Sequence, residues 1–252
     1  MEPILNVRGL KKVFHQRGKR DVVAVNNISF KLNSGEILGI VGESGSGKST
    51  VAKLITRLID VTEGEIILDG QDITHLKGTA LKEAYSKIQM IFQNPTGSFD
   101  PRKTLGDGIG ESLKNKGVPK AEVRKKVADL MEQCGLSEEY IDRYPHQVSG
   151  GQCQRAAIAR ALAVDPKIII CDEATSALDV TVQKRVIELL QNLKENKNLS
   201  YVFICHNLAL VQQFCDRVIV MKDGQVVETG IPDEVIWNPR EEYTRMLINS
   251  VF

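Results

Sequence analysis

The stretch GESGSGKST at residues 42–50 constrains the fold of this chain more than any other segment. It fits the pattern G-x-x-x-x-G-K-[ST] through Gly42, Gly47, Lys48 and Ser49. The apolar run EILGIV precedes it, and VAKLITRLI, with apolar residues at helical spacing, follows it. A strand, a glycine-rich loop and a helix in this order predict an α/β core in which the loop binds a phosphate.

The residue types in this loop suit phosphate binding. Glycines let backbone N–H groups converge on phosphate oxygens, Lys48 can reach the β and γ phosphates, and the hydroxyl of Ser49 suits Mg²⁺. The alternative, a flexible surface loop, leaves the lysine unexplained. The predicted nucleotide-contacting residues of the loop are Gly42, Glu43, Ser44, Gly45, Ser46, Gly47, Lys48, Ser49 and Thr50.

The composition is that of an ordinary globular protein. The 252 residues are 42% hydrophobic and 26% charged, with a formal net charge of +1, so no nucleic-acid partner is expected. The opening MEPILNVRGLKKVF lacks a secretory-signal pattern, and runs such as YVFIC are far shorter than the roughly 18 residues of a membrane span. We therefore expect a cytoplasmic protein that acts on a membrane only through a partner. The five cysteines form no CxxC pair, which favours reduced thiols.

The chain divides into an α/β part and a helical part. The first quarter holds three segments typical of strands, ILNVRGLKKVF, VVAVNNISFKL and EILGIV, and EGEIILDGQDI, after VAKLITRLI, returns to strand and turn. Helical patterns dominate from about Thr79 to Tyr144. Helices and the strands KIIICDE, SYVFICH, RVIVMKDG and QVVETG follow. The tail WNPREEYTRMLIN predicts a final helix with Asn238 as N-cap and Pro239 in the first helical position. We predict one domain, with an α/β core at 1–92 and 157–252 and an inserted helical section at 93–156.

A second glycine stretch, VSGGQCQR, leads directly into another helix. The N–H groups and partial positive charge of a helix N-terminus favour an anion, so this stretch is a candidate phosphate site. A plain helix cap, with a serine capping and the glycines making a turn, explains the same letters. The residues concerned are Ser149, Gly150, Gly151 and Gln152.

Polar residues directly follow several predicted core strands, where α/β proteins place their ligands. Gln93, after QMIF, is by itself an ordinary loop residue, but beside the other motifs it is a candidate for sensing Mg²⁺ or the attacking water. KIIICDE ends in Asp172, suited to hold Mg²⁺, and Glu173, suited to polarise water; strand alternation predicts that they face different ways. His206 ends SYVFICH and can donate a hydrogen bond to a phosphate. Asp179, in SALD, either caps the next helix or contacts a partner chain.

Taken in order, GESGSGKST, Gln93, VSGGQ, IIICDE, SALD and His206 resemble the nucleotide-binding domain of an ATP-binding cassette (ABC) protein over nearly the whole chain. The resemblance implies a P-loop NTPase (RecA-like) α/β core, an N-terminal antiparallel β subdomain and an inserted α-helical subdomain with VSGGQ as its signature motif. It implies ATP and Mg²⁺ as ligands, with Ser49, Gln93 and Asp172 at the metal. Glu173, His206 and Gln93 are then the catalytic side chains.

The same resemblance implies a head-to-tail dimer, in which the signature of one chain closes over ATP held by the glycine loop of the other. Residues 149–152 would then serve the partner's nucleotide, which suits a reaction that depends on electrostatic stabilisation. Phe14, in LKKVF, matches the family's adenine-stacking aromatic residue, with core packing as the alternative. Four residues depart from the family pattern: Val148, Cys171, Cys205 and Asn207. None of these departures removes a catalytic side chain, so we expect competent hydrolysis.

Further segments, FQNPTGSFDPRKT, YPHQVSGGQ, QRGKRDVVAVNNISF and NPREEYTRML, resemble the ATPase subunits of bacterial dipeptide, oligopeptide and nickel importers. This implies a second ATPase subunit, identical or homologous, two membrane permease subunits, an external solute-binding protein and a place at the cytoplasmic face of the membrane. The loop after Gln93 and the helical section would receive a coupling helix of the permease. The competing hypothesis is a non-transport ABC ATPase acting on DNA or ribosomes, and the cargo cannot be read from this chain.

Overall fold

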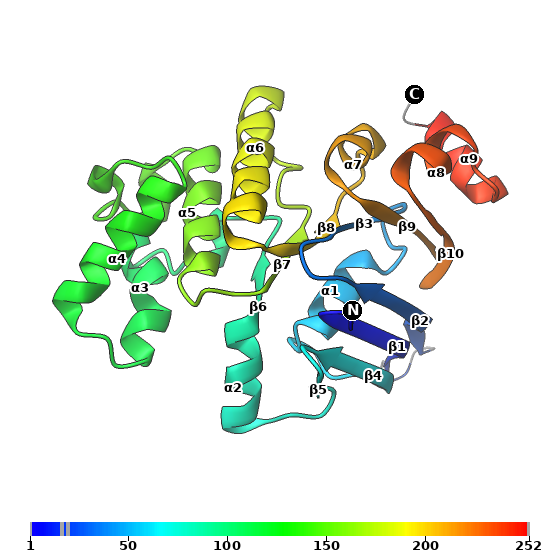
Figure 1. Cartoon of the computed structure of the whole chain (residues 1–252), viewed down its shortest axis with the longest axis horizontal. Coiled ribbons are helices and arrows are strands. Elements are labelled where there is room, and N and C mark those ends of the chain that lie inside the picture. Colours follow the sequence, from blue (N-terminus) through cyan, green and yellow to red (C-terminus); the bar gives the residue numbers. More distant parts are fainter. Residues whose placement is uncertain (1, 16–17, 19–20, 251–252) are drawn as a thin grey trace. The chain divides into compact units, whose positions relative to one another are not determined.

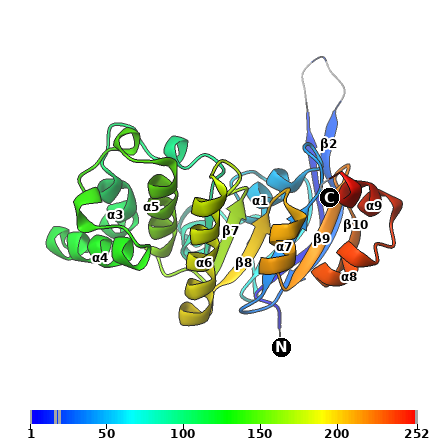
Figure 2. The same ribbon diagram turned by 90° about the horizontal axis from the view of Figure 1, so that it is seen from above.

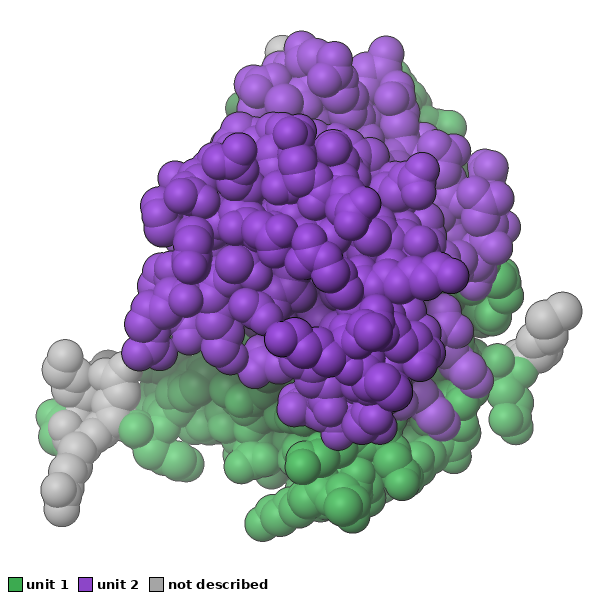
Figure 3. Space-filling view, turned by 90° about the vertical axis from the view of Figure 1, so that its left-hand side faces the viewer, with its two compact units in different colours: residues 1–85, 198–252 green, residues 86–197 purple. Residues whose placement is uncertain are grey.

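The computed structural model describes residues 2–15, 18 and 21–250, and the chain forms two compact units. Residues 1–85 and 198–252 make up the first unit, and residues 86–197 make up the second (Figure 3). The second unit is longer at both ends than the helical insertion predicted at 93–156, and the predicted boundaries stay a prediction.

A four-stranded antiparallel sheet belongs to the first unit (Figure 1). In it β1 (Leu5–Phe14) lies between β2 (Val22–Leu32) and β4 (Glu63–Leu68), and β5 (Gln71–Asp72) pairs with β4. Val7 pairs with Phe30 on one side and Ile66 on the other, and all three side chains are buried. One face of this sheet therefore contributes to the core of the unit.

The other strands of the first unit are mainly parallel. β3 (Ile37–Val41) lies between β8 (Ser200–Ile204) and β9 (Arg217–Lys222), parallel to both, and β10 (Gln225–Gly230) pairs antiparallel with β9. Every residue of β3 and β8 is buried, as in parallel strands that are covered on both faces. Since parallel strands end at the same edge, the loops after β3 and β8 meet there.

Helices of the first unit follow these strands. They are α1 (Lys48–Ile55) after β3, α7 (Leu208–Phe214) after β8, and α8 (Pro232–Trp237) and α9 (Glu242–Asn249) after β10, while α2 (Gly78–Lys87) leads into the second unit. Figure 2 shows α7 and α8 side by side. The sequence did not predict α7 and α8, because two turns are too short for a helical period to be recognised.

The predicted start of the final helix is wrong. Asn238 is the C-cap residue of α8, and the last helix begins only at Glu242. Glu228 of β10 explains the delay, because its carboxylate accepts hydrogen bonds from the backbone N–H groups of Arg240 (2.9 Å) and Glu241 (3.3 Å). These bonds hold the connection in a non-helical conformation.

The second unit combines two parallel strands with a group of helices. β6 (Ile88–Ile91) pairs with β7 (Ile168–Asp172), which lies between α5 (Gly150–Leu162) and α6 (Val180–Lys197) in the chain. α3 (Leu105–Asn115) and α4 (Lys120–Gln133) pack against each other and against α5. The segment predicted to be mainly helical thus contains α3 and α4, together with β6.

Within the described ranges, no helix combines the length and the apolarity needed to cross a membrane. The five cysteines are buried and form no disulfides, in agreement with the prediction of reduced thiols. Burial raises the pKa of the Cys134 thiol to about 12, despite the nearby cations Arg155 and Lys197, so this thiol stays protonated at neutral pH.

Candidate functional site

The glycine loop connects β3 to α1, and its shape requires glycine at two positions. Gly42 has φ of 149°, and a Cβ there would lie 2.2 Å from the carbonyl oxygen of Met221. Gly47, the N-cap of α1, has φ of 100°, and its Cβ would lie 2.4 Å from the carbonyl oxygen of Ala24. The glycines therefore let this loop pack against neighbouring backbone, and the loop brings the N–H groups of a helix N-terminus to one place.

Lys48 lies at the centre of this loop. Its side chain is buried, and its ammonium group donates to the carbonyl oxygens of Gly42 (2.7 Å) and Glu43 (2.7 Å) and to the hydroxyl of Ser46 (3.3 Å). All three acceptors belong to the loop itself. A cation solvated by neutral loop groups beside a helix N-terminus favours an anion, so the loop fits a phosphate group.

His206 reaches the same loop from the end of β8. Its Nδ1 lies 3.1 Å from the carbonyl oxygen of Gly42. Asn207, one of the residues that depart from the family pattern, is the N-cap of α7, and its side chain accepts a hydrogen bond from the N–H of Leu210 (3.1 Å). The structure therefore places His206 beside the first residue of the glycine loop, and its role at a phosphate stays a prediction.

Gln93 and Glu173 meet in the second unit. The amide nitrogen Nε2 of Gln93 donates to Oε2 of Glu173 at 2.6 Å. Asp172 ends β7 and is buried, whereas Glu173 lies beyond the strand with φ of 50°, a left-handed conformation that is uncommon for a residue other than glycine. Strand alternation thus does not extend to Glu173, and its carboxylate is directed by this turn and by Gln93. Non-glycine residues in such conformations often occur at functional sites.

The signature stretch begins α5 with a complete capping box. Ser149 is the N-cap, and its hydroxyl accepts from the N–H of Gln152 (3.2 Å), while Oε1 of Gln152 accepts from the N–H of Ser149 (2.8 Å). The side-chain amide of Gln152 also donates to the hydroxyl of Tyr140 (2.8 Å). The helix-cap interpretation is therefore correct, and it leaves the exposed Gly150 on the surface of the helix N-terminus. Capping and anion binding are compatible at such an end.

The other end of α5 holds the segment that follows Gln93. The guanidinium group of Arg160 donates to the carbonyl oxygen (2.6 Å) and the hydroxyl (2.9 Å) of Ser98. The central carbon Cζ of this guanidinium group lies 4.3 Å from the ring centroid of Phe99. One helix therefore joins the signature stretch to the turn at 96–98. Sequence reasoning missed Arg160, because an arginine in a helix gives no sign of a partner 62 residues away.

Two other predicted residues take simple places. Asp179 caps α6, with its carboxylate accepting from the N–H of Val182 at 2.9 Å, so the capping alternative is observed. Phe14 ends β1 with 38% of its surface exposed, and the ammonium of Lys12 lies 5.2 Å from its ring centroid. An exposed ring is available for stacking, so adenine contact stays a prediction.

The predicted metal ligands are a hydroxyl, an amide and a carboxylate, the oxygen donors that Mg²⁺ prefers. Ser49 belongs to the first unit, and Gln93 and Asp172 belong to the second. The described residues contain no cluster of three His, Cys, Asp or Glu side chains arranged for a metal. The chemistry of the donor set fits Mg²⁺, and the set itself stays a prediction.

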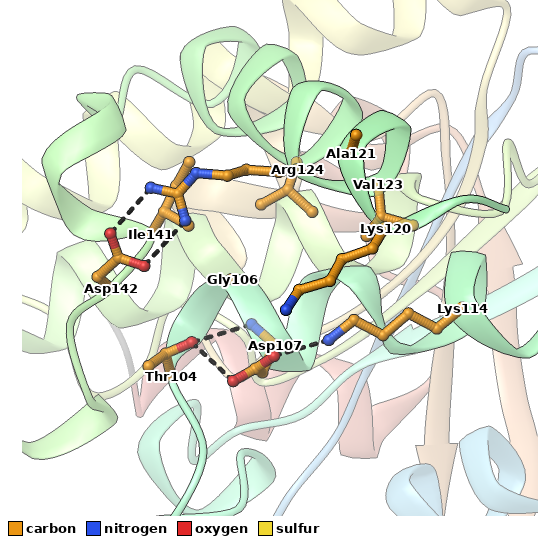
Figure 4. A pocket seen from close by; sticks show the side chains of 11 residues that line it. Thr104, Gly106, Asp107, Lys114, Lys120, Ala121, Val123, Arg124, Ile141 and Asp142 are labelled. Carbon is orange, nitrogen blue, oxygen red and sulfur yellow. Dashed lines mark hydrogen bonds and ion pairs between the residues drawn. The ribbon is translucent and has the colours of Figure 1, made fainter.

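A hollow of about 770 Å³ lies between α3, α4 and the segment at 141–142 (Figure 4). Apolar side chains line part of it, and charged pairs lie at its edge. Lys114 contacts Asp107 at 2.7 Å, and Arg124 contacts Asp142 at 2.9 Å. Figure 4 shows the Lys120 side chain extending toward Asp107. The apolar lining comprises Val123, Val127 and Ile141.

Known proteins resemble this chain over most of its length. A protein-family model described as "ABC transporter" matches residues 25–176. The glutathione import ATP-binding protein GsiA of Salmonella typhimurium (strain LT2) is 48% identical over 257 aligned residues, which cover 99% of this chain and 41% of that protein. The oligopeptide transport ATP-binding protein OppF of Streptococcus mutans serotype c is 44% identical, covering 98% of this chain and 81% of that protein. This chain thus spans about two fifths of the GsiA relatives.

Solved structures show the same architecture. The ATP-binding cassette MJ0796, in a dimeric post-hydrolysis state bound to ADP and Pi, has a TM-score of 0.83 and 31% identity, covering 90% of this chain and 98% of that one. The protein cbiO1 from Clostridium perfringens, part of the ABC transporter complex cbiONQ, has a TM-score of 0.82 and 28% identity, covering 94% of this chain and 92% of that one. These likenesses confirm the predicted α/β fold class.

Proposed function

The chain belongs to the ABC transporter family, and we propose that it is the ATP-hydrolysing subunit of a bacterial importer. The observation that carries this proposal is the hydrogen bond of 2.6 Å between Gln93 and Glu173. It places the Glu173 carboxylate, which is suited to activating water, next to the Gln93 amide, which is suited to contacting Mg²⁺ or that water. In the first unit, the buried Lys48 in its glycine loop gives separate support, because this loop fits a phosphate group.

In the proposed reaction, the loop and Lys48 hold the phosphates of ATP. The ammonium group exchanges its carbonyl partners for phosphate oxygens, so charge develops in the transition state beside a cation that is already in place. The oxygen of a water molecule bonds to the γ-phosphorus as the bond from that phosphorus to the bridging oxygen breaks, which releases ADP. Glu173 accepts a proton from this water, and His206 donates a hydrogen bond to the γ-phosphate. Mg²⁺, held by Ser49, Gln93 and Asp172, would neutralise charge on the phosphate oxygens.

The active form is a head-to-tail dimer in which the signature stretch at 149–152 faces the nucleotide of a second ATPase subunit. Its support is the helix N-terminus of α5, where the exposed Gly150 follows the N-cap residue Ser149. The likeness to a cassette described as dimeric and bound to ADP and Pi points the same way. A second subunit would then complete each site.

The membrane partner is a pair of permease subunits, with an external solute-binding protein delivering cargo to them. The proposed contact comprises the turn at 96–98 and the hollow between α3 and α4. Both adjoin α5, the helix that begins with the signature stretch: Arg160 of α5 binds Ser98 of the turn, and α3 and α4 pack against α5. Movement of α5 toward a nucleotide would thereby displace the permease contact. The subunit then works at the cytoplasmic face of the membrane.

The cargo class is a peptide or a metal complex such as one of nickel. The peptide alternative has support from relatives named for glutathione, oligopeptide and dipeptide import. The proposal for nickel rests on the sequence resemblance alone.

ATP turnover by the Glu173→Gln variant tests the catalytic assignment. We expect turnover, measured with the permease partners present, to fall at least about a hundredfold, the usual range for loss of a general base. Glu195→Gln is the matched control, since Glu195 is an exposed residue of α6 in the same unit. Equal turnover in the wild-type and Glu173→Gln proteins would refute the assignment.

Co-purification from membranes tests the importer assignment. We expect the tagged chain to recover permease subunits, and a deletion strain to lose uptake of labelled peptides or of Ni²⁺. Recovery with ribosomes or DNA and without a permease would instead identify a non-transport ATPase.

A further inference from the structure

We propose that Tyr243 is a positioning residue for ATP, acting through the peptide group of Glu43 in the glycine loop. The backbone N–H of Glu43 donates to the hydroxyl of Tyr243 at 3.1 Å. The two residues are 200 positions apart in the chain and belong to the same compact unit. This inference rests on the proposed ATP-binding role of the loop.

The tyrosine is held firmly enough to act in this way. Its side chain is buried on α9, and the ammonium of Lys222 lies 4.8 Å from its ring centroid. Glu228 fixes the chain just before α9 through the N–H groups of Arg240 and Glu241. The hydroxyl group therefore approaches the loop from a side chain whose ring and backbone are both restrained.

Tyr243 and Lys48 hold the peptide group between Gly42 and Glu43 from its two ends. Lys48 donates to the carbonyl oxygen of Gly42 at 2.7 Å, and Tyr243 accepts from the N–H of Glu43 at 3.1 Å. When Lys48 turns to a phosphate, the carbonyl contact is lost and the tyrosine contact remains. Tyr243 thereby keeps the start of the loop in its binding conformation after Lys48 has exchanged the loop carbonyl for a phosphate.

The hydroxyl stays neutral while it does so. Burial, together with the charges of Glu43 and Asp223, raises the pKa of Tyr243, although the hydrogen bond from Glu43 lowers it. A neutral phenol beside the loop accepts the N–H of Glu43 without placing a negative charge next to a triphosphate.

The test is the Tyr243→Phe variant, which removes one oxygen atom and keeps the ring over Lys222. We expect KM for ATP to rise roughly two- to tenfold, the effect of one net hydrogen bond, with kcat at saturating ATP unchanged. Tyr85→Phe is the matched control. It also removes a partly buried tyrosine hydroxyl, which donates to the carbonyl oxygen of Arg57 at 3.2 Å. Tyr85 belongs to the same unit but has no hydrogen bond to the loop among those described.

An unchanged KM in Tyr243→Phe, or an equal rise in both variants, would overturn the inference. A fall in kcat with KM unchanged would also overturn it, since a positioning role affects binding. Failure of the proposed function looks different, because the wild-type protein would then neither bind a fluorescent ATP analogue nor hydrolyse ATP.

Discussion

At the scale of single residues, the glycines of the phosphate loop have different tasks. Gly45 and Gly47 both adopt positive φ, 85° and 100°, so each needs the conformational freedom of glycine. Of the two, only Gly47 is packed against the backbone of another segment. A Cβ atom added at Gly47 would lie 2.4 Å from the carbonyl oxygen of Ala24. Around Gly45 the corresponding space is open within 4 Å.

This difference leads to a paired prediction. Gly45→Ala should cost about 1 kcal/mol in the free energy of unfolding, the strain of a left-handed alanine, and keep ATP binding. Gly47→Ala adds a backbone clash, so we expect a larger loss, roughly 3 kcal/mol, together with loss of ATP binding. Urea unfolding and nucleotide titration measure the two effects, and equal losses in both variants would contradict the explanation.

Single residues also mark what the sequence could and could not reveal. Lys48 and His206 were predictable, because each stands at a fixed place after a recognisable strand. Tyr243 and Arg160 were not, because their partners lie 200 and 62 positions away and only the folded chain brings them together. The φ of Glu173 is a further example, since nothing in the letters CDEAT signals a left-handed turn.

At the scale of elements, the same end of α5 carries the proposed signature stretch and a structural cap. Ser149 caps this helix as Thr104 caps α3, where the threonine hydroxyl accepts from the N–H of Asp107 at 3.1 Å. Both helices belong to the second unit, so the two caps can be compared directly.

Removing each cap separates its two roles. Ser149→Ala and Thr104→Ala should each lower the free energy of unfolding by about 1 kcal/mol, seen as a fall in Tm of about 2–4 °C. Only Ser149→Ala should also lower ATP turnover of the purified chain, because only that helix faces a nucleotide in the proposed dimer. The dimer arrangement would be untenable if both variants hydrolysed ATP equally well.

The final helix shows why element boundaries resist prediction. Asn238 and Pro239 are typical of a helix start. However, Glu228 of β10 accepts hydrogen bonds from the N–H groups of Arg240 and Glu241, which would have lain in the first turn of that helix. The internal pattern of α9 was recognisable, whereas its first residue depends on a tertiary contact.

The same contact predicts a dependence on pH. Burial alone would raise the pKa of Glu228, but the hydrogen bonds from the backbone N–H groups of Arg240 and Glu241 outweigh it, and the pKa is lowered. The ionised Glu228 carboxylate therefore stabilises the folded state fully above the pKa that it has in the unfolded chain, about 4.3. This stabilisation is lost as pH falls through the lower pKa of the folded state. Hydrogen-exchange protection of α9 should decrease below about pH 4 in the wild type.

The Glu228→Gln variant isolates this effect. It should show reduced protection of α9 already at neutral pH and a weaker acid dependence, while Glu234→Gln, an exposed residue of α8, should behave as the wild type. Identical acid profiles in wild type and Glu228→Gln would assign the dependence to other carboxylates.

At the scale of the whole molecule, the glycine loop and the signature stretch belong to different compact units of one chain, and the proposed site joins the loop of one copy to the signature of another. A symmetric dimer then contains two such sites. Gly150 offers a way to damage the signature without disturbing the fold, since the nearest atom that the described residues would present to a Cβ there belongs to Leu178, at 4.0 Å.

Mixing two inactive variants tests this arrangement directly. Gly150→Glu places a negative charge where the partner's phosphates would lie, and Glu173→Gln removes the base, so each variant alone should be inactive. Half of the dimers in an equimolar mixture combine the two chains, and each mixed dimer has one intact site of two, so turnover should recover to about a quarter of the wild-type rate. If mixing restored no activity, the site would not be shared between copies of this chain, and its second half would have to come from a different ATPase subunit.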